Sequence, residues 1–556
     1  MPSVTSGIPI PEHLWPRWTT QELESQLSDL AALAANENER QRFSERSALI
    51  NEIVAKLEST YTEPSVRFQC LRVLGNVCAD NNLNRNLVMS VPGFVDALDS
   101  CWSGPDEKLR NTAIIVAFNF CNDYDVAQSF LVKARNDVLG LLVSMLANIH
   151  DEATAAYVLR LMEFLILNEA FTENKLRPDA LPVILRAIPA SEVADNIILI
   201  STLLTFESFR LQTLKNNYAD LILLCEKYEL LIDTEDVDAL KVILGDFSNI
   251  SGMDVFSAES IPESLVELWE RWISLYDNRA QTSYLRVAGL TFIGNLCTNE
   301  TACVYMVNSR NTHISAISII KNSNSTANEM YSAAGLLKNL AISDKNKRTL
   351  VQSDVFSAIG RLLECDESPQ VIFSALGLLR VVLSNSYENA HDFVSTDYKN
   401  VFLTKAVQLH SQHSEKSIRL ETSRLFCTLI RSLSLKSDQD LDLVTTIAPE
   451  NTETKLTTVL SMILSLLNEE QHRRILSSEA LFSLALVARD SKAAAAVAEI
   501  LDNSSDLSGK VREIFTSTEF DDKVKDNAKT LMLVVGQAAT EGGNAYKIYK
   551  ELARDV

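Results

Sequence analysis

Asparagine is the residue whose type and spacing in this chain could do chemistry. A side-chain amide carries both a hydrogen-bond donor and an acceptor, so a row of amides can bind the backbone of a partner protein. Five asparagines each stand near the end of an apolar run that polar residues follow: Asn76, Asn119, Asn249, Asn295 and Asn339. For any single one, the alternative is that the amide satisfies backbone groups of a nearby loop or helix end. The set as a whole favours a binding surface.

The common sequence motifs of catalysis are missing. Neither GxxxxGK[ST] nor GxGxxG occurs, so no glycine-rich loop is available to hold phosphate. There is no GxSxG motif, and no pair of carboxylates can be singled out. His410 and His413 form an HxxH pair, but no cysteine lies nearby and the segment is typical of an exposed helix end. We predict no catalytic residue, no metal site and no cofactor.

The asparagines recur with the period of a structural repeat. The spacing is 43 residues from Asn76 to Asn119, 46 from Asn249 to Asn295 and 44 from Asn295 to Asn339. The remaining interval, from Asn119 to Asn249, is 130 residues, or three periods of about 43. Such a period is typical of armadillo and HEAT repeats.

One period contains three helical segments. Residues 344–355 and 356–368 predict a short and a medium helix, and residues 370–383 predict a long one that is apolar nearly all round. Ser368 and Pro369 suit the cap and the first turn of this third helix. Three helices per repeat favour an armadillo repeat over the two-helix HEAT unit.

We therefore predict an all-α fold, an armadillo-repeat solenoid forming a right-handed superhelix of roughly ten three-helix repeats. Such an array has an extended concave surface, which the third helices line. Residues 1–19 show no helical pattern and predict an extended or disordered segment. Residues 20–556 predict a single solenoid, with an irregular polar insertion near residues 434–455.

Composition limits the partners and the compartment. The net charge of −22 argues against nucleic acid and against anionic membrane surfaces, which both need a basic face. The longest charge-free apolar stretch is too short to span a bilayer as a helix, so we expect no direct membrane insertion. Nine cysteines without a CxxC pair predict a reduced, cytoplasmic protein.

A classical nuclear-import receptor is also disfavoured. In those armadillo proteins a tryptophan stands four residues before each ladder asparagine. The residues at that offset here are Arg72, Ile115, Gly245, Thr291 and Gly335, and none is aromatic.

The second half of the chain resembles the small-GTPase GDP dissociation stimulator (smgGDS) family of armadillo proteins. The segments that carry the resemblance follow one another in the family's order: LRVAGLTFIGNLCTNETACVYMV (285–307), YSAAGLLKNLAISDKNKRTLV (331–351), VIFSALGLLRVVL (371–383), ETSRLFCTLIRS (421–432) and SSEALFSLALVA (477–488). The first half matches in repeat period and in short pieces such as LGNVCADNNLNRNLV (74–88).

The resemblance implies a partner and an activity. It implies binding of Rho- and Rap-type small GTPases with polybasic, prenylated C-termini, which the protein would serve as an unconventional guanine-nucleotide exchange factor and escort. An exchange factor of this kind needs no catalytic residue, because it need only bind the nucleotide-free GTPase more tightly than the loaded form. The alternative is a general armadillo scaffold or adaptor that binds an extended peptide and leaves nucleotide exchange unchanged.

The resemblance also implies particular site residues. Asn295 and Asn339 match two asparagines implicated in GTPase contact. Arg380 and Arg424, on the following third helices, are further candidates by position, with a solvated helix face as the alternative. The acidic patch expected to attract a basic tail corresponds to Asp233, Glu235, Asp236 and Asp238. An ordinary helix start, where acidic residues are favoured, is the alternative for this patch.

Overall fold

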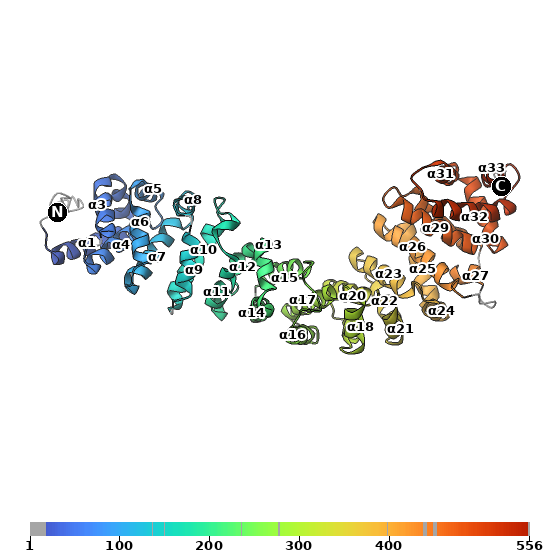
Figure 1. Cartoon of the computed structure of the whole chain (residues 1–556), viewed down its shortest axis with the longest axis horizontal. Helices are drawn as coiled ribbons and strands as arrows, with labels where there is room; N and C mark the ends of the chain where they lie inside the picture. Colours follow the sequence, from blue (N-terminus) through green and yellow to red (C-terminus); the bar gives the residue numbers. More distant parts are fainter. Residues whose placement is uncertain are drawn as a thin grey trace, which may run out of the picture. The chain divides into compact units, whose positions relative to one another are not determined.

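The computed structural model describes residues 18–553, apart from residues 60, 136, 150, 235, 276–278, 397, 437–441 and 449–452. Its regular structure over these residues is helical (Figure 1). The chain divides into unit 1, Met1–Ile250, and unit 2, Ser251–Val556. A single solenoid over residues 20–556 stays a prediction. Most of the predicted N-terminal segment, residues 1–17, lies outside the described residues.

One helix of each repeat lies against its counterpart in a neighbouring repeat, and we call these the third helices. Most of them are long, whereas α12 (Ile197–Leu204) has eight residues. In unit 1, α1, α4, α7, α10 and α12 pack in succession, and in unit 2 so do α17, α20, α23, α26, α29 and α32. Their bounds are α1 Thr20–Ala35, α4 Pro64–Cys78, α7 Glu107–Cys121, α10 Glu152–Leu167, α12 Ile197–Leu204, α15 Val237–Ser251, α17 Ala280–Leu296, α20 Ala327–Leu340, α23 Pro369–Leu383, α26 Lys416–Leu433, α29 Arg473–Val487 and α32 Asp522–Ala538.

Along the chain, the first and second helices of each repeat lie between successive third helices. In unit 1 they are α2 Glu37–Arg40, α3 Ser47–Glu58, α5 Asn82–Ser90, α6 Phe94–Trp102, α8 Asp125–Ala134, α9 Val138–Leu146, α11 Leu181–Ala187, α13 Glu207–Thr213 and α14 Ala219–Leu230. In unit 2 they are α16 Glu263–Ile273, α18 Glu300–Asn308, α19 Thr312–Lys321, α21 Asp344–Gln352, α22 Val355–Leu363, α24 Tyr387–Ser395, α25 Tyr398–Gln412, α27 Leu443–Ile447, α28 Glu453–Ser465, α30 Ser491–Asn503, α31 Ser505–Thr516 and α33 Asn544–Leu552. The short helix α27 lies within the segment predicted as a polar insertion.

The sequence explains where the helices of a repeat begin and end. The three helices predicted over residues 344–383 are α21, α22 and α23, and Pro369 occupies the first turn of α23 as expected. The break between the first two helices needs a left-handed backbone, which glycine, asparagine and aspartate tolerate best. Gly93, Asn311 and Asp354 hold that position in three repeats, with φ of 81°, 56° and 68°.

The core of each unit runs between the stacked helices. Along α23 most side chains are buried, including Leu376, Leu379 and Leu383, which agrees with the prediction of an enclosed third helix. At the start of unit 2, the ring of Trp269 on α16 stacks on that of Phe292 on α17, with centroids 4.3 Å apart and planes 6° from parallel. Both rings are fully buried, so this stack fixes α16 against α17.

The cysteines are part of this core. Eight of the nine are buried thiols outside any disulfide bond, and Cys365 is half-buried. Burial raises the pKa of Cys70, Cys78 and Cys427 to about 12, so these thiols stay protonated at neutral pH. Within the described part of the chain, we find no helix long and apolar enough to cross a membrane.

Candidate functional site

Four of the predicted asparagines make one type of bond. Each donates a hydrogen bond from Nδ2 to the preceding third helix, 44 or 45 residues back in the chain. Asn76 bonds the carbonyl oxygen of Ala31 at 2.8 Å, Asn119 that of Gly75 at 3.0 Å and Asn339 that of Gly294 at 2.9 Å. Asn295 instead bonds the hydroxyl of Ser251, the first residue of unit 2, at 2.8 Å.

These bonds give the asparagines a structural role that the sequence left open. Asn76, Asn119 and Asn339 each use one N–H to bond a backbone carbonyl of the preceding third helix, which ties one repeat to the next. The alternative interpretation had instead named backbone groups of a nearby loop or helix end. All four residues are half-buried, and their Oδ1 atoms accept no hydrogen bond from the described residues. A partner could therefore still donate to them. Asn249 differs, because it is exposed and makes no such bond, while Ser251 two residues later receives the bond from Asn295.

Arg380 and Arg424 belong to a chain of ion pairs that links three third helices. Arg380 on α23 donates to Glu421 on α26. Arg424 on α26 donates to both carboxylate oxygens of Glu479 on α29, at 2.9 and 3.0 Å, and its other terminal nitrogen lies 3.5 Å from Glu421. The two arginines are therefore neither a freely solvated helix face nor unpaired cations awaiting a partner.

The ionisation of this chain follows from its geometry. Burial is the largest single influence on Glu479 and raises its pKa. The hydrogen bonds from Arg424, together with the positive charges of Arg424, Arg431 and Arg380, outweigh burial, so the net shift of the pKa is downward. The same bonds raise the pKa of Arg424. Both groups stay charged at neutral pH, and the pair joins neighbouring repeats. It lies on the surface that the third helices form, which we call the third-helix face.

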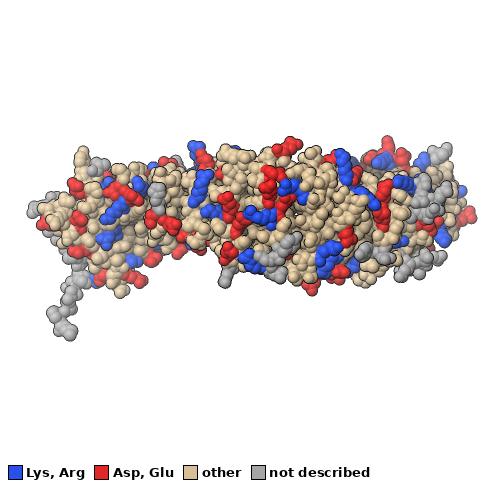
Figure 2. Space-filling view, turned by 90° about the horizontal axis from the view of Figure 1, so that it is seen from below, with Lys and Arg blue, Asp and Glu red and all other residues tan. Residues whose placement is uncertain are grey.

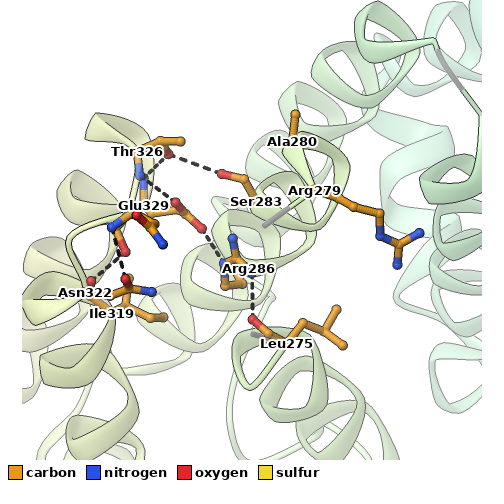
Figure 3. Close-up of a pocket in the computed structure, with 11 residues that line it drawn as sticks. Leu275, Arg279, Ala280, Ser283, Arg286, Ile319, Asn322, Thr326 and Glu329 are labelled. Carbon is orange, nitrogen blue, oxygen red and sulfur yellow. Dashed lines mark hydrogen bonds and ion pairs between the residues drawn. The ribbon is translucent and has the colours of Figure 1, made fainter. Parts of the chain in front are cut away.

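A similar ion pair lines a pocket of about 290 Å³ at the start of α17 and α20 (Figure 3). Arg286 on α17 pairs with Glu329 on α20 and also donates to the carbonyl oxygen of Leu275. Beside them, the hydroxyls of Ser283 and Thr326 lie 3.2 Å apart. In this pocket Arg286 binds Glu329 and Ser283 binds Thr326, so we assign it to repeat stacking.

The predicted acidic patch lies at the start of α15. Asp236 accepts hydrogen bonds from the backbone N–H groups of Asp238 and Ala239, and Asp238 forms an ion pair with Lys241 at 2.8 Å. Asp233, Asp236 and Asp238 are exposed, and Glu235 lies outside the described residues. On the face that Figure 2 presents, acidic and basic side chains are interspersed, without one continuous acidic area. The geometry of Asp236 and Asp238 is that of an ordinary helix start.

A row of exposed apolar side chains on the third helices of unit 1 was missed by the sequence analysis. Ile115, Tyr157, Ile198 and Val242 lie on α7, α10, α12 and α15, at intervals of 42, 41 and 44 residues, and each is 37–51% exposed. We call these four residues the unit 1 stripe. Their recurrence at the repeat period was the signal that could have revealed them, since an isolated exposed apolar residue is common.

Aromatic side chains widen the unit 1 stripe at α7 and α10. The ring of Phe118 contacts those of Tyr157 and Phe164, with centroids 5.1 and 5.7 Å apart. The guanidinium of Arg160 lies over the Phe164 ring, 5.3 Å from its centroid. Aromatic and arginine side chains grouped in this way are enriched where proteins bind one another.

Unit 2 has a hollow on its third-helix face. A pocket of about 610 Å³ lies among α23, α26 and α29. Phe373, Leu420 and Ile475 supply apolar walls, with Phe373 and Ile475 39% and 58% exposed. Arg424 and Glu421 border it, so the ion-pair chain forms one side of the hollow.

Comparison with known proteins bears on the fold. No protein-family model matches this chain, and no curated protein matches it. Among solved structures, a chain from the SYS-1/POP-1 complex is 10% identical, with a TM-score of 0.62 over 96% of this chain and 98% of that one. A chain from a study of the interaction between cadherin and beta-catenin is 16% identical, with a TM-score of 0.56 over 91% of this chain and 99% of that one.

These likenesses extend over nearly the whole chain and agree with the three-helix repeat. The protein is an all-helical armadillo-repeat solenoid, as the sequence predicts. At such low identity the likeness concerns the fold alone, so the partner has to be argued from the chain's own surface.

Proposed function

We propose that this protein binds a partner protein along its third-helix face and has no chemistry of its own. The observation that carries the proposal is the unit 1 stripe, in which four successive third helices each expose an apolar side chain at the repeat period. The hollow beside Phe373 in unit 2 supports it, since an apolar pocket with polar groups at its border suits an anchoring side chain. One structural neighbour of this fold was solved as the SYS-1/POP-1 complex, which agrees with such a role.

The partner we favour is a small GTPase of the Rho or Rap type with a polybasic, prenylated C-terminus. This choice rests on the resemblance of residues 285–488 to the smgGDS family and on the unoccupied Oδ1 atoms of Asn295 and Asn339 on adjacent third helices. The net charge of −22 favours a basic partner. In this proposal the protein acts as an exchange factor and escort by holding the nucleotide-free GTPase.

Release of fluorescent GDP from a panel of Rho- and Rap-type GTPases tests this proposal. We expect the wild-type protein to accelerate release, most strongly from GTPases that keep their basic tail. The double variant Asn295→Ala/Asn339→Ala should lose most of the acceleration, roughly 10-fold or more, because two acceptors that face the partner are removed.

The matched control is Asn76→Ala/Asn119→Ala. It removes two inter-repeat hydrogen bonds of the same type from unit 1 and leaves Asn295 and Asn339 in place, so it reproduces a loss of stacking without removing their Oδ1 acceptors. If both double variants lose activity equally, the asparagines act only through stability. If the wild type neither accelerates release nor binds prenylated or unprenylated GTPases, the GTPase assignment is wrong.

The unit 1 stripe gives a second prediction, which holds for any protein partner. Ile198→Ser/Val242→Ser should leave the melting temperature nearly unchanged, because both residues lie on the surface, 51% and 39% exposed. Binding of the partner should weaken by about 10-fold or more, since two apolar contacts of about 1 kcal/mol each are lost. Calorimetric titration measures the loss. Leu83→Ser, at an exposed residue of α5 outside the third helices, is the control.

A general scaffold is the second candidate. The chain of ion pairs through Arg380 and Arg424 favours it, because these arginines are already engaged within the protein. A scaffold would bind an extended segment on the same face, would depend on the unit 1 stripe in the same way, and would leave GDP release unchanged.

A further inference from the structure

A buried carboxyl group without a basic partner lies between two third helices of unit 1. Asp246 on α15 is 5% exposed. Its Oδ1 accepts a hydrogen bond from the hydroxyl of Ser201 on α12 at 3.2 Å, and its Oδ2 has no hydrogen-bond partner. An ionised carboxylate in such a place loses its hydration without full compensation.

The other buried acids of the described residues are better satisfied. The buried acidic residues are Glu163, Asp220, Asp246, Glu329 and Glu421. Glu163 pairs with Arg160, Glu329 with Arg286 and Glu421 with Arg380, and Asp220 accepts from the side-chain amide of Gln212. Ser201 faces Asp246, whereas an arginine of the preceding third helix faces each of the buried acids of unit 2.

The groups around Asp246 do not supply the missing charge. Arg210 on α13 is the nearby cation, but it donates to the carbonyl oxygens of Leu204 and Thr205 at the end of α12. Tyr228 on α14 packs on Phe247 and lies 3.4 Å from the carbonyl oxygen of Leu240. On α15 itself, Lys241 is paired with Asp238.

Burial therefore dominates the ionisation of this group. It raises the pKa of Asp246 to about 7, although the Ser201 hydroxyl and the charge of Arg210 act in the opposite direction. Ser201 also lies in the last turn of α12, where the helix dipole disfavours a negative charge.

We propose that Asp246 is a proton-dependent lock between α12 and α15, which holds the two helices together when its carboxyl is protonated and loosens them when it ionises. In an opened state the carboxyl would regain its ordinary pKa near 3.8. Between that value and pH 7 the packed state holds a proton that the opened state has lost. The packing therefore weakens as pH rises through this window and levels off above it.

The lock bears on binding through the unit 1 stripe. Val242 lies one helical turn before Asp246, and Ile198 lies on α12 near Ser201. Loosening would displace two residues of the stripe from their common face. This consequence rests on the proposed function, whereas the lock itself does not.

Hydrogen exchange of α12 and α15 in the full-length protein tests the lock. The wild type and Asp246→Asn are compared at each pH from 5 to 8, so the intrinsic pH dependence of exchange cancels in the ratio of their rates. Asparagine has no charge to gain, so we expect that ratio, wild type over variant, to rise by up to about tenfold per pH unit between pH 5 and 7 and to level off above pH 7.

Two further variants separate the lock from a general charge effect. Asp238→Asn removes the same charge from the exposed, ion-paired end of α15, and its ratio should not change with pH. Ser201→Ala removes the hydroxyl that favours the ionised form of Asp246. The pH at which the loosening of α12 and α15 levels off should therefore be higher in this variant than in the wild type. A pH-independent ratio for Asp246→Asn, or an equal response from Asp238→Asn, would overturn the proposal.

Discussion

Replacing Glu421 with alanine is expected to destabilise unit 2 by about 3 kcal/mol. The carboxylate is 5% exposed, and it accepts from Arg380 of the preceding third helix while lying 3.5 Å from Arg424 of its own. Its removal leaves two guanidinium groups on the third-helix face without this partner. Both arginines reach solvent, with side chains 23% and 26% exposed, so we place the cost at the lower end for a broken buried pair. Calorimetric melting of the purified protein measures the loss.

A surface acid just before the same helix provides the comparison. Glu415 precedes α26, is exposed and makes no side-chain cap, so Glu415→Ala should change stability by less than about 0.5 kcal/mol. Glu421→Gln keeps an acceptor for Arg380 and should lie between the two. Equal melting temperatures for Glu421→Ala and Glu415→Ala would contradict a structural role for the ion-pair chain.

Trp269→Ala is expected to cost about 3–5 kcal/mol, also in unit 2. The indole is fully buried and stacks on Phe292, with Phe256 6.1 Å away, centroid to centroid. Alanine would leave a large cavity between α16 and α17, at the first repeat of the unit. Denaturant unfolding followed by far-ultraviolet circular dichroism measures the loss.

Trp269→Phe tests whether stacking area or the indole N–H matters. Nε1 of Trp269 is buried without a hydrogen-bond partner, so phenylalanine removes an unsatisfied donor while keeping an aromatic ring on Phe292. We expect most of the stability to return. A loss as large as that of alanine would instead show that the second ring of the indole supplies the contact.

The helices of a repeat were predictable because local signals and periodicity agree there. The apolar run of α23, with Pro369 in its first turn, required no knowledge of neighbours. The bonds between repeats, in contrast, could be predicted only with knowledge of how neighbouring repeats pack. Asn249 fits the sequence pattern, but the bond from Asn295 reaches Ser251, because the facing position depends on how far α15 turns before it ends. For the same reason the partners of Arg380 and Arg424, 41 and 55 residues away, could not be read from spacing alone.

The candidate surface was partly predictable. The sequence predicted asparagines on the third helices but could not show that four of the five donate one N–H to the preceding third helix. The predicted site consisted of polar residues, so the unit 1 stripe was missed. Ile115 belongs to the stripe and lies four residues before Asn119, at the offset where nuclear-import receptors carry a tryptophan. Asp246 was missed because its unusual feature is that a serine of another helix faces it, where an arginine faces the buried acids of unit 2. The residue that faces a side chain across two helices cannot be read from sequence spacing.

The burial of the thiols makes cysteine chemistry a report on the integrity of the solenoid. Eight cysteines are enclosed in the folded chain, and only Cys365, just after α22, is half-buried. A maleimide dye should therefore attach first at Cys365, which gives a single labelling position in the native protein. Opening of a repeat would present further thiols to the same reagent. The number of dyes bound per molecule would then count how much of the array has come apart.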